Sequence, residues 1–152
     1  MYSKLKTKLQ KNEIIILDGG IGTELERRGV PMNIAVWSGA AVKTHPDTVR
    51  QVHEDYIASG ADIITANTFS SNRHSLLHNG MEDLVQEVNT RSVSLAQEAR
   101  DNAKINRDVF IAGAISTNSP YHNPTIPQKA GSDYLEQASI LAESGVDLIM
   151  ME

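Results

Sequence analysis

The chain alternates between short apolar runs and longer amphipathic stretches. Four runs are almost wholly apolar and rich in β-branched residues, which is typical of strands buried on both faces of a parallel sheet. They occupy residues 14–17, 61–69, 109–116 and 146–151. The pattern therefore predicts four parallel strands.

The stretches between these runs predict helices, because their apolar residues recur at steps of three and four. We expect helices over residues 24–29, 46–59, 82–103 and 132–144, with Pro46 at the first helical position and Gly60 and Gly145 ending two of them. The inner face of the last helix is expected to carry four apolar residues, namely Leu135, Ala138, Leu141 and Ala142.

The resulting order of elements, βαβαβαβ, requires right-handed crossovers and a parallel sheet. Both a Rossmann-like open sheet and part of a (β/α)8 barrel fit this order. A complete barrel needs about 250 residues, whereas this chain has 152. Four strands are therefore half of what a barrel requires.

Composition narrows the function classes. A net charge of −5 gives no support for binding to nucleic acid or to an anionic membrane. There is no run of about 18 apolar residues and no apolar segment of a secretory signal after the basic residues 1–8, so we expect a cytoplasmic protein. The sequence contains no cysteine, which excludes disulfides and thiolate metal ligands within it.

The most informative stretch follows the first predicted strand, where Asp18 is followed by Gly19, Gly20 and Gly22. Glycines let the backbone approach a ligand closely and point amide groups at an anion. A carboxylate beside free amides suits the ammonium and carboxylate groups of an amino acid. The alternative is a tight strand-to-helix turn with a solvated aspartate, in which Thr23 caps the next helix and Gly29 ends it. The spacing is not the dinucleotide fingerprint G-x-G-x-x-G.

Polar residues follow all four predicted strands. They are Asp18, Asn67 with Thr68, Ser116 with Thr117, and Glu152. In parallel α/β folds the carboxyl ends of the strands gather at the functional site. Two carboxylates there could form an acid–base pair or bind one cation, and the pattern leaves both open.

One pair of histidines has a spacing found in metal sites. His74 and His78 are four residues apart and could share a helix face. The neighbouring sequence offers no glutamate or cysteine to complete the set, so we expect a solvated helix end and no metal site.

Taken together, these segments resemble the homocysteine S-methyltransferase family. The resemblance rests on residues 17–25, 37–38, 45–46, 53–56, 59–65 and 67–69, in this order and at the family's spacing. Members are (β/α)8 barrels that methylate the sulfur of homocysteine to give methionine. In the family, a zinc ion held by three cysteines binds the substrate as a thiolate, which attacks the methyl group of a donor.

The resemblance implies a role for each residue of the candidate site. Asp18 and Glu152 would receive the amino group of homocysteine, and the backbone at Gly19 and Gly20, with Ser38, would lie near its carboxylate. Asn67 and Thr68 would line the floor of the same pocket. Residues 119–121 resemble a segment that borders the methyl donor in relatives, without its usual glycines.

One departure from the family is large: this sequence lacks the zinc cysteines, which lie in the second half of the family's barrel. We therefore expect residues 1–152 to be one partial domain, the amino-terminal half of a (β/α)8 TIM barrel, without activity alone. Its expected partners are homocysteine, a methyl donor and either a complementary half-barrel or further copies of itself. The alternatives are a non-catalytic half-barrel that binds a small amino acid or a partner chain, and a phosphate-binding α/β enzyme. Asp18 would repel a phosphate, which argues against the latter.

Overall fold

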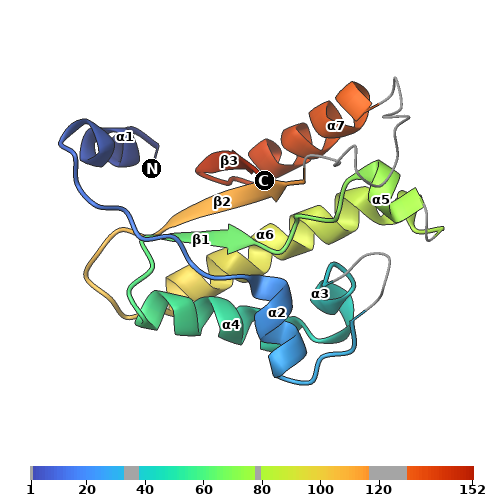
Figure 1. Ribbon diagram of the computed structural model, residues 1–152, viewed down its shortest axis with the longest axis horizontal. Helices are drawn as coiled ribbons and strands as arrows, with labels where there is room; N and C mark the ends of the chain where they lie inside the picture. The colour runs from blue at the N-terminus through green and yellow to red at the C-terminus, as the bar shows by residue number, and fades with distance from the viewer. Residues whose placement is uncertain (1, 33–37, 78–79, 117–129) are drawn as a thin grey trace.

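The computed structural model describes residues 2–32, 38–77, 80–116 and 130–152, and all structural statements below refer to them. The helices are α1 (Tyr2–Gln10), α2 (Ile21–Arg27), α3 (Ala41–Thr44), α4 (Pro46–Ala58), α5 (Arg73–Leu77), α6 (Val85–Asn102) and α7 (Ala130–Glu143), with a 3-10 turn, η1 (Glu82–Leu84), before α6. The strands are β1 (Ile63–Ala66), β2 (Phe110–Ile115) and β3 (Leu148–Met151). Figure 1 shows their arrangement.

The three strands form one parallel sheet in the order β1-β2-β3. Every residue of the central strand β2 is buried. One face of the sheet packs against α4, α6 and α7 in an apolar cluster that includes Ile57, Val93, Ile111 and Leu141. Because each crossover passes through a helix on this face, the three carboxyl ends lie at the same edge of the sheet.

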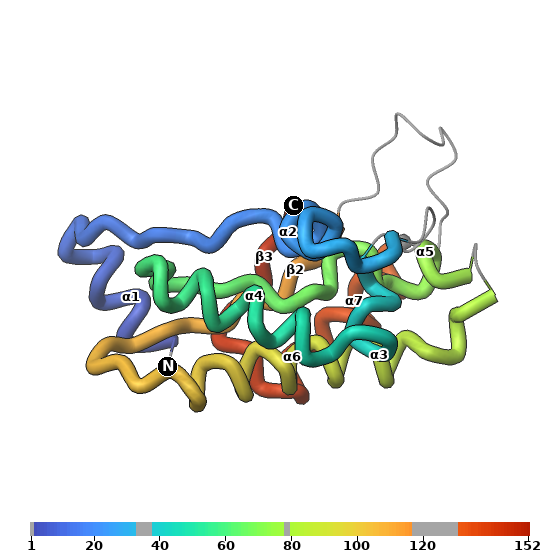
Figure 2. The backbone as a smooth tube through the Cα atoms, turned by 90° about the horizontal axis from the view of Figure 1, so that it is seen from below, coloured from blue at the N-terminus to red at the C-terminus, as the bar shows by residue number. Residues whose placement is uncertain are grey.

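The opposite face of the sheet has a different cover. Leu5 of α1 is buried against Ile63, Phe110 and Ala112. An extended segment then carries the chain from α1 to α2, as Figure 2 shows. The carboxyl ends of the strands lie away from α1, and it is there that the candidate site opens.

The first predicted strand is the main departure from expectation. Residues 14–17 do not form a regular strand: Leu17 makes an isolated parallel bridge to Ile63, and the amides of Asp62 and Ile63 donate to the carbonyl of Ile16. The prediction that residues 14–17 lie parallel to β1 is confirmed. The prediction that this segment is buried on both faces is wrong. Ile14 is 87% exposed and Leu17 51%, because no element in the described part of the chain covers the faces to which these side chains point.

The predicted helices are confirmed, with two local corrections. Helix α2 begins at Ile21, and the Thr23 hydroxyl donates to the carbonyl of Gly20 (3.0 Å), so Thr23 is not the cap. In α7, Leu135 is 69% exposed and Ala142 is exposed as well, whereas Gln137 is fully buried. No helix in the described ranges is long and apolar enough to cross a bilayer.

Candidate functional site

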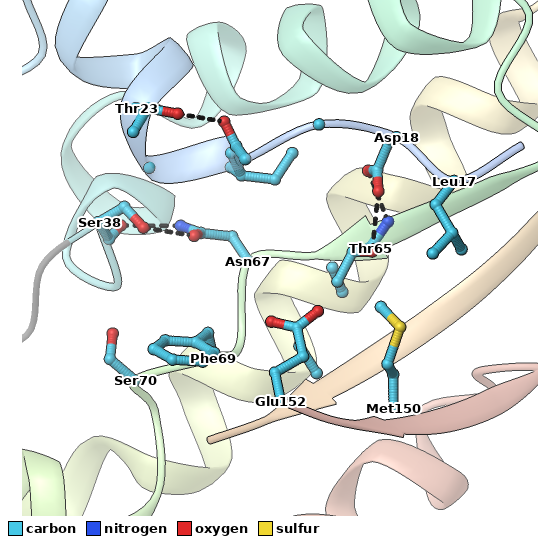
Figure 3. A pocket seen from close by; sticks show the side chains of 16 residues that line it. Leu17, Asp18, Thr23, Ser38, Thr65, Asn67, Phe69, Ser70, Met150 and Glu152 are labelled. Atoms are coloured by element: carbon cyan, nitrogen blue, oxygen red, sulfur yellow. Dashed lines mark hydrogen bonds between the residues drawn. The ribbon is translucent and has the colours of Figure 1, made fainter. Parts of the chain in front are cut away.

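A cavity of about 350 Å³ opens at the carboxyl ends of the strands. It is lined by residues 17–23 of the glycine turn, by Ser38, by the end of β1 and the loop after it (Thr65, Ala66, Asn67, Phe69 and Ser70), and by Ala114, Met150 and Glu152. Figure 3 shows these side chains around the opening. The structure thus brings together residues that are more than one hundred positions apart in the sequence.

Two hydrogen bonds from Thr65 hold the Asp18 side chain in the cavity. One of its oxygens accepts a hydrogen bond from the Thr65 amide (2.7 Å) and the other accepts one from the Thr65 hydroxyl (2.9 Å). Burial raises the pKa of Asp18 above its ordinary value, the bonds from Thr65 act in the opposite direction, and the charge of Glu152 raises the pKa further. Since a carboxylate offers about four acceptor positions, Asp18 keeps room for a ligand.

Glu152 brings a second carboxylate to the same cavity from the end of β3, as Figure 3 shows. We refer to Asp18 and Glu152 as the carboxylate pair. Their charges repel, since Glu152 raises the pKa of Asp18, and a bound cation would relieve this repulsion. The two Thr65 donors to Asp18 match its ionised form, which favours the cation-binding alternative over an acid–base pair.

The glycine turn approaches Tyr56 of α4 closely. The Tyr56 hydroxyl donates to the carbonyl of Gly20 (3.4 Å), and a Cβ atom added to Gly19 would lie 2.7 Å from the same hydroxyl oxygen. Glycine at position 19 therefore avoids a close contact with the Tyr56 side chain. The first turn of α2 follows, and its leading amides have no partner inside the helix.

Replacing Gly19 by alanine is expected to destabilise the fold by about 1–3 kcal/mol, because the new methyl group overpacks against the Tyr56 ring. Gly20→Ala is the matched control, since its Cβ would meet only the Thr23 hydroxyl (2.8 Å), which can rotate away. Urea unfolding of the two variants checks this. Equal losses of stability would show that Tyr56 does not constrain the turn.

Ser38 and Asn67 line the cavity as a reciprocal pair. The Ser38 hydroxyl donates to Asn67 Oδ1 (2.6 Å), and Asn67 Nδ2 donates to the Ser38 carbonyl (2.8 Å). Both residues are buried. Their polar atoms mainly bind one another, so the pair fixes the segment at Ser38 against the end of β1.

The structure does not bring every predicted residue to the cavity. Thr68 is fully buried and its hydroxyl donates to the Ala114 carbonyl (2.8 Å), so it lies behind the cavity wall. Ser116 is not among the lining residues. Several residues singled out from the sequence lie outside the described residues, namely Trp37, His78, Thr117 and residues 119–121.

Other lining residues were not foreseen from the sequence. Thr65 lies inside an apolar run, but it is two positions before Asn67 and so shares its face of the strand, which is a usable signal. Leu17, Phe69 and Met150 supply the apolar part of the lining. An exposed Phe69 directly after a strand (46% exposed) becomes informative only once the cavity is seen.

The residues present do not fit the zinc site that the resemblance implies. The sequence has no cysteine, and no group of three His, Asp or Glu residues within the described ranges is arranged to hold a metal ion. A zinc ion bound by three thiolates cannot be formed from this chain.

Comparison with known proteins decides the family. The family profile described as "Homocysteine S-methyltransferase" matches residues 15–152. The chain belongs to the homocysteine S-methyltransferase family. Among curated proteins, it is 30% identical to selenocysteine methyltransferase of Astragalus bisulcatus over 94% of this chain and 51% of that protein. It is 37% identical to homocysteine S-methyltransferase YbgG of Bacillus subtilis (strain 168) over 58% of this chain and 28% of that protein.

A solved structure of the family has the same fold. The metallated form of the homocysteine methyltransferase MmuM from Escherichia coli matches with a TM-score of 0.81 at 24% identity, over 97% of this chain and 56% of that chain. The chain spans about half the length of the first relatives that it matches.

Proposed function

We propose that this chain is the amino-acid-binding half of a homocysteine S-methyltransferase. The carboxylate pair would hold the ammonium group of homocysteine, and the observation that carries the proposal is the setting of Asp18. Its charge is held by Thr65 in a partly buried position near a second negative charge. A cationic ligand group would remove a repulsion that the free site contains.

The rest of the cavity supports an amino acid as the ligand. The backbone at Gly19 and Gly20, with Ser38, would lie near the ligand carboxylate. Leu17 and Met150 would contact the two methylene groups of homocysteine, since apolar side chains line that part of the cavity. Asn67 would contribute by holding Ser38 in place. Thr68 would act only through the backbone that it anchors.

The proposed reaction is transfer of a methyl group from a donor to the homocysteine sulfur. The thiol loses its proton to solvent, the sulfur forms a bond to the methyl carbon, and the bond between that carbon and the donor breaks with its electron pair leaving on the donor. In the family, zinc supplies the activation of the thiol. Because this chain offers no thiolate ligands, we assign the zinc site to the other half of the complete protein.

We further propose that residues 1–152 fold as the amino-terminal half of a (β/α)8 barrel. Three observations support this: the parallel β-α order, the match to about half the length of the first relatives, and the two incompletely covered sheet edges. These edges are the segment 14–17 and β3, where Ile149 and Met151 are exposed. Further strands pairing there would close the barrel.

Calorimetric titration of the purified protein with L-homocysteine tests the ligand. We expect binding, and at least about tenfold weaker binding of two analogues, 4-mercaptobutyrate without the ammonium and 3-mercaptopropylamine without the carboxylate. The same protein is expected to form no methionine with any methyl donor, with or without zinc. Equal binding of all three thiols would contradict the proposed amino-acid site, and zinc-dependent methionine formation would contradict the assignment of a half enzyme.

The titration also distinguishes the proposed methyltransferase half from the alternative, a non-catalytic half-barrel that binds a small amino acid. If the protein bound glycine or alanine with the same affinity as homocysteine, it would be a general amino-acid-binding half-barrel. Glycine and alanine lack the thiol and most of the apolar side chain of homocysteine. Weaker binding of both would favour the methyltransferase.

A further inference from the structure

The loop after β1 forms one wall of the cavity, and its carbonyl groups are bound from behind. Phe69 and Ser70 of this loop line the cavity. On its other side, the carbonyls of Thr68 and Ser71 accept hydrogen bonds from side chains of α7 and α6. Figure 1 shows the amino-terminal parts of these two helices lying near α5, which continues from the loop.

Two buried amide side chains make these contacts. Gln137 Nε2 of α7 donates to the Thr68 carbonyl (2.8 Å) and to Asn89 Oδ1 (3.1 Å). Asn89 Nδ2 of α6 donates to the carbonyls of Ser71 and Val85 (both 2.8 Å). We refer to Asn89 and Gln137 as the amide pair. Each NH2 group thus uses both of its hydrogens, and both residues are fully buried.

The neighbouring carbonyls of the loop are held as well. The Phe69 carbonyl accepts a bond from the Ser116 amide (3.2 Å). The Ser92 hydroxyl of α6 lies 3.1 Å from the Asn67 carbonyl, although its single hydrogen has a second acceptor, the Val88 carbonyl, at 2.8 Å. Within the loop, the Thr68 carbonyl accepts a bond from the Ser71 amide (3.0 Å), and it accepts the bond from α7 in addition. The donors from α6, α7 and Ser116 therefore supply most of the bonds that determine which way the loop faces.

From these contacts we propose that the amide pair positions the ligand-binding loop. By binding the carbonyls of Thr68 and Ser71, the pair turns the backbone of residues 67–71 toward the helices and leaves Phe69 and Ser70 facing the cavity. A wall fixed in this way before the ligand arrives does not have to be ordered on binding. Asn89 and Gln137 are positioning residues that touch no ligand, and their effect on homocysteine rests on the proposed function.

The polarity of position 137 supports this inference. The position lies on the buried face of α7 beside Ile140 and Leu141, where an apolar residue would pack without the need for hydrogen bonds. Within the described residues, the Oε1 atom of Gln137 has no hydrogen-bond partner. A buried amide with one unsatisfied atom lowers the stability of the fold. The contribution of Gln137 therefore lies in its two donor contacts, to the loop and to Asn89.

Gln137→Met tests the proposal, with Gln97→Met as the matched control. Gln97 of α6 also donates from a side-chain amide to a backbone carbonyl, that of Ser144 (3.0 Å), but far from the loop. Hydrogen–deuterium exchange is measured on the full chain in the assembly that it forms in solution. We expect exchange in residues 67–72 to become about tenfold faster in Gln137→Met and to stay unchanged in Gln97→Met. Ser92→Ala, a milder change, should accelerate the same segment less.

Homocysteine titration gives the second readout. Gln137→Met should bind homocysteine about tenfold more weakly than wild type. The control variant Gln97→Met should bind it with the affinity of wild type. Unchanged exchange in residues 67–72 of Gln137→Met would overturn the positioning role, whether or not homocysteine binds. A wild-type protein that binds no homocysteine would instead overturn the proposed function, while the exchange result would still decide the role of the amide pair.

Discussion

Replacing Asp18 by asparagine is expected to weaken homocysteine binding roughly 10- to 150-fold. The change removes a charge-assisted hydrogen bond to the ligand ammonium worth about 1.5–3 kcal/mol. Asparagine is nearly isosteric, and its amide can still accept from the Thr65 amide while donating to the Thr65 hydroxyl, so the turn keeps its contacts. Glu152→Gln should weaken binding likewise. Calorimetric titration checks both variants, and unchanged affinity in both would remove the carboxylate pair from the site.

The stability of the ligand-free Asp18→Asn variant provides the control. Since the pKa of Asp18 is raised in the folded state, mainly by burial, protonated Asp18 favours the folded state. That contribution is fully present below the ordinary pKa of 3.8 and is lost as the pH rises through the raised value. At neutral pH the variant should therefore be at least as stable to urea as wild type. A ligand-free variant that unfolds more easily would mean that its weak binding reflects damage to the fold.

The parallel βα order and the position of the candidate site at the strand ends could both be predicted from the sequence. The apolar runs around Ile64 and Ile111 are long enough to mark strands, and the polar residues directly after them mark the edge where ligands bind. Asp18 and Glu152 were found in this way. Their convergence on one cavity follows from the parallel topology, which brings separate strand ends to the same edge.

Features that depend on tertiary neighbours could not be predicted. The run at residues 14–17 has the composition of a buried strand, yet Ile14 is exposed because burial of a strand side chain requires another element over its face. Gln137 interrupts the apolar periodicity of α7, so the pattern assigned Leu135 to the inner face. The buried face carries Ile140 and Leu141 together with Gln137, which binds the Thr68 carbonyl and Asn89. Neither partner is local in sequence.

Thr68 illustrates a limit of assigning roles one residue at a time. It follows Asn67 directly, and both are polar residues at the end of the same strand. Adjacent residues of a strand point to opposite faces, so only one of the two can line the cavity. Asn67 does so, whereas Thr68 lies behind the wall and bonds to Ala114.

The isolated 152-residue chain is not expected to persist as a well-folded monomer. The segment 14–17 bonds to β1 on one side only, with Ile14 87% and Ile16 53% exposed, and Met151 of β3 is 54% exposed. Incompletely paired apolar edges template association with other chains. We therefore expect sedimentation velocity at micromolar concentration to show edge-to-edge assemblies, aggregates or, where a complementary half is supplied, a defined complex.

A charge on the edge should shift this equilibrium. Ile14→Lys places an ammonium on the exposed edge at little cost to the fold, because the side chain is already in solvent. It should reduce self-association, whereas Leu9→Lys, on α1 and 56% exposed, alters a comparable apolar residue that is not on a strand edge and should not. A sharp wild-type monomer peak together with a cooperative thermal transition would contradict the half-barrel proposal. Equal effects of the two lysines would show that association does not depend on the strand edge.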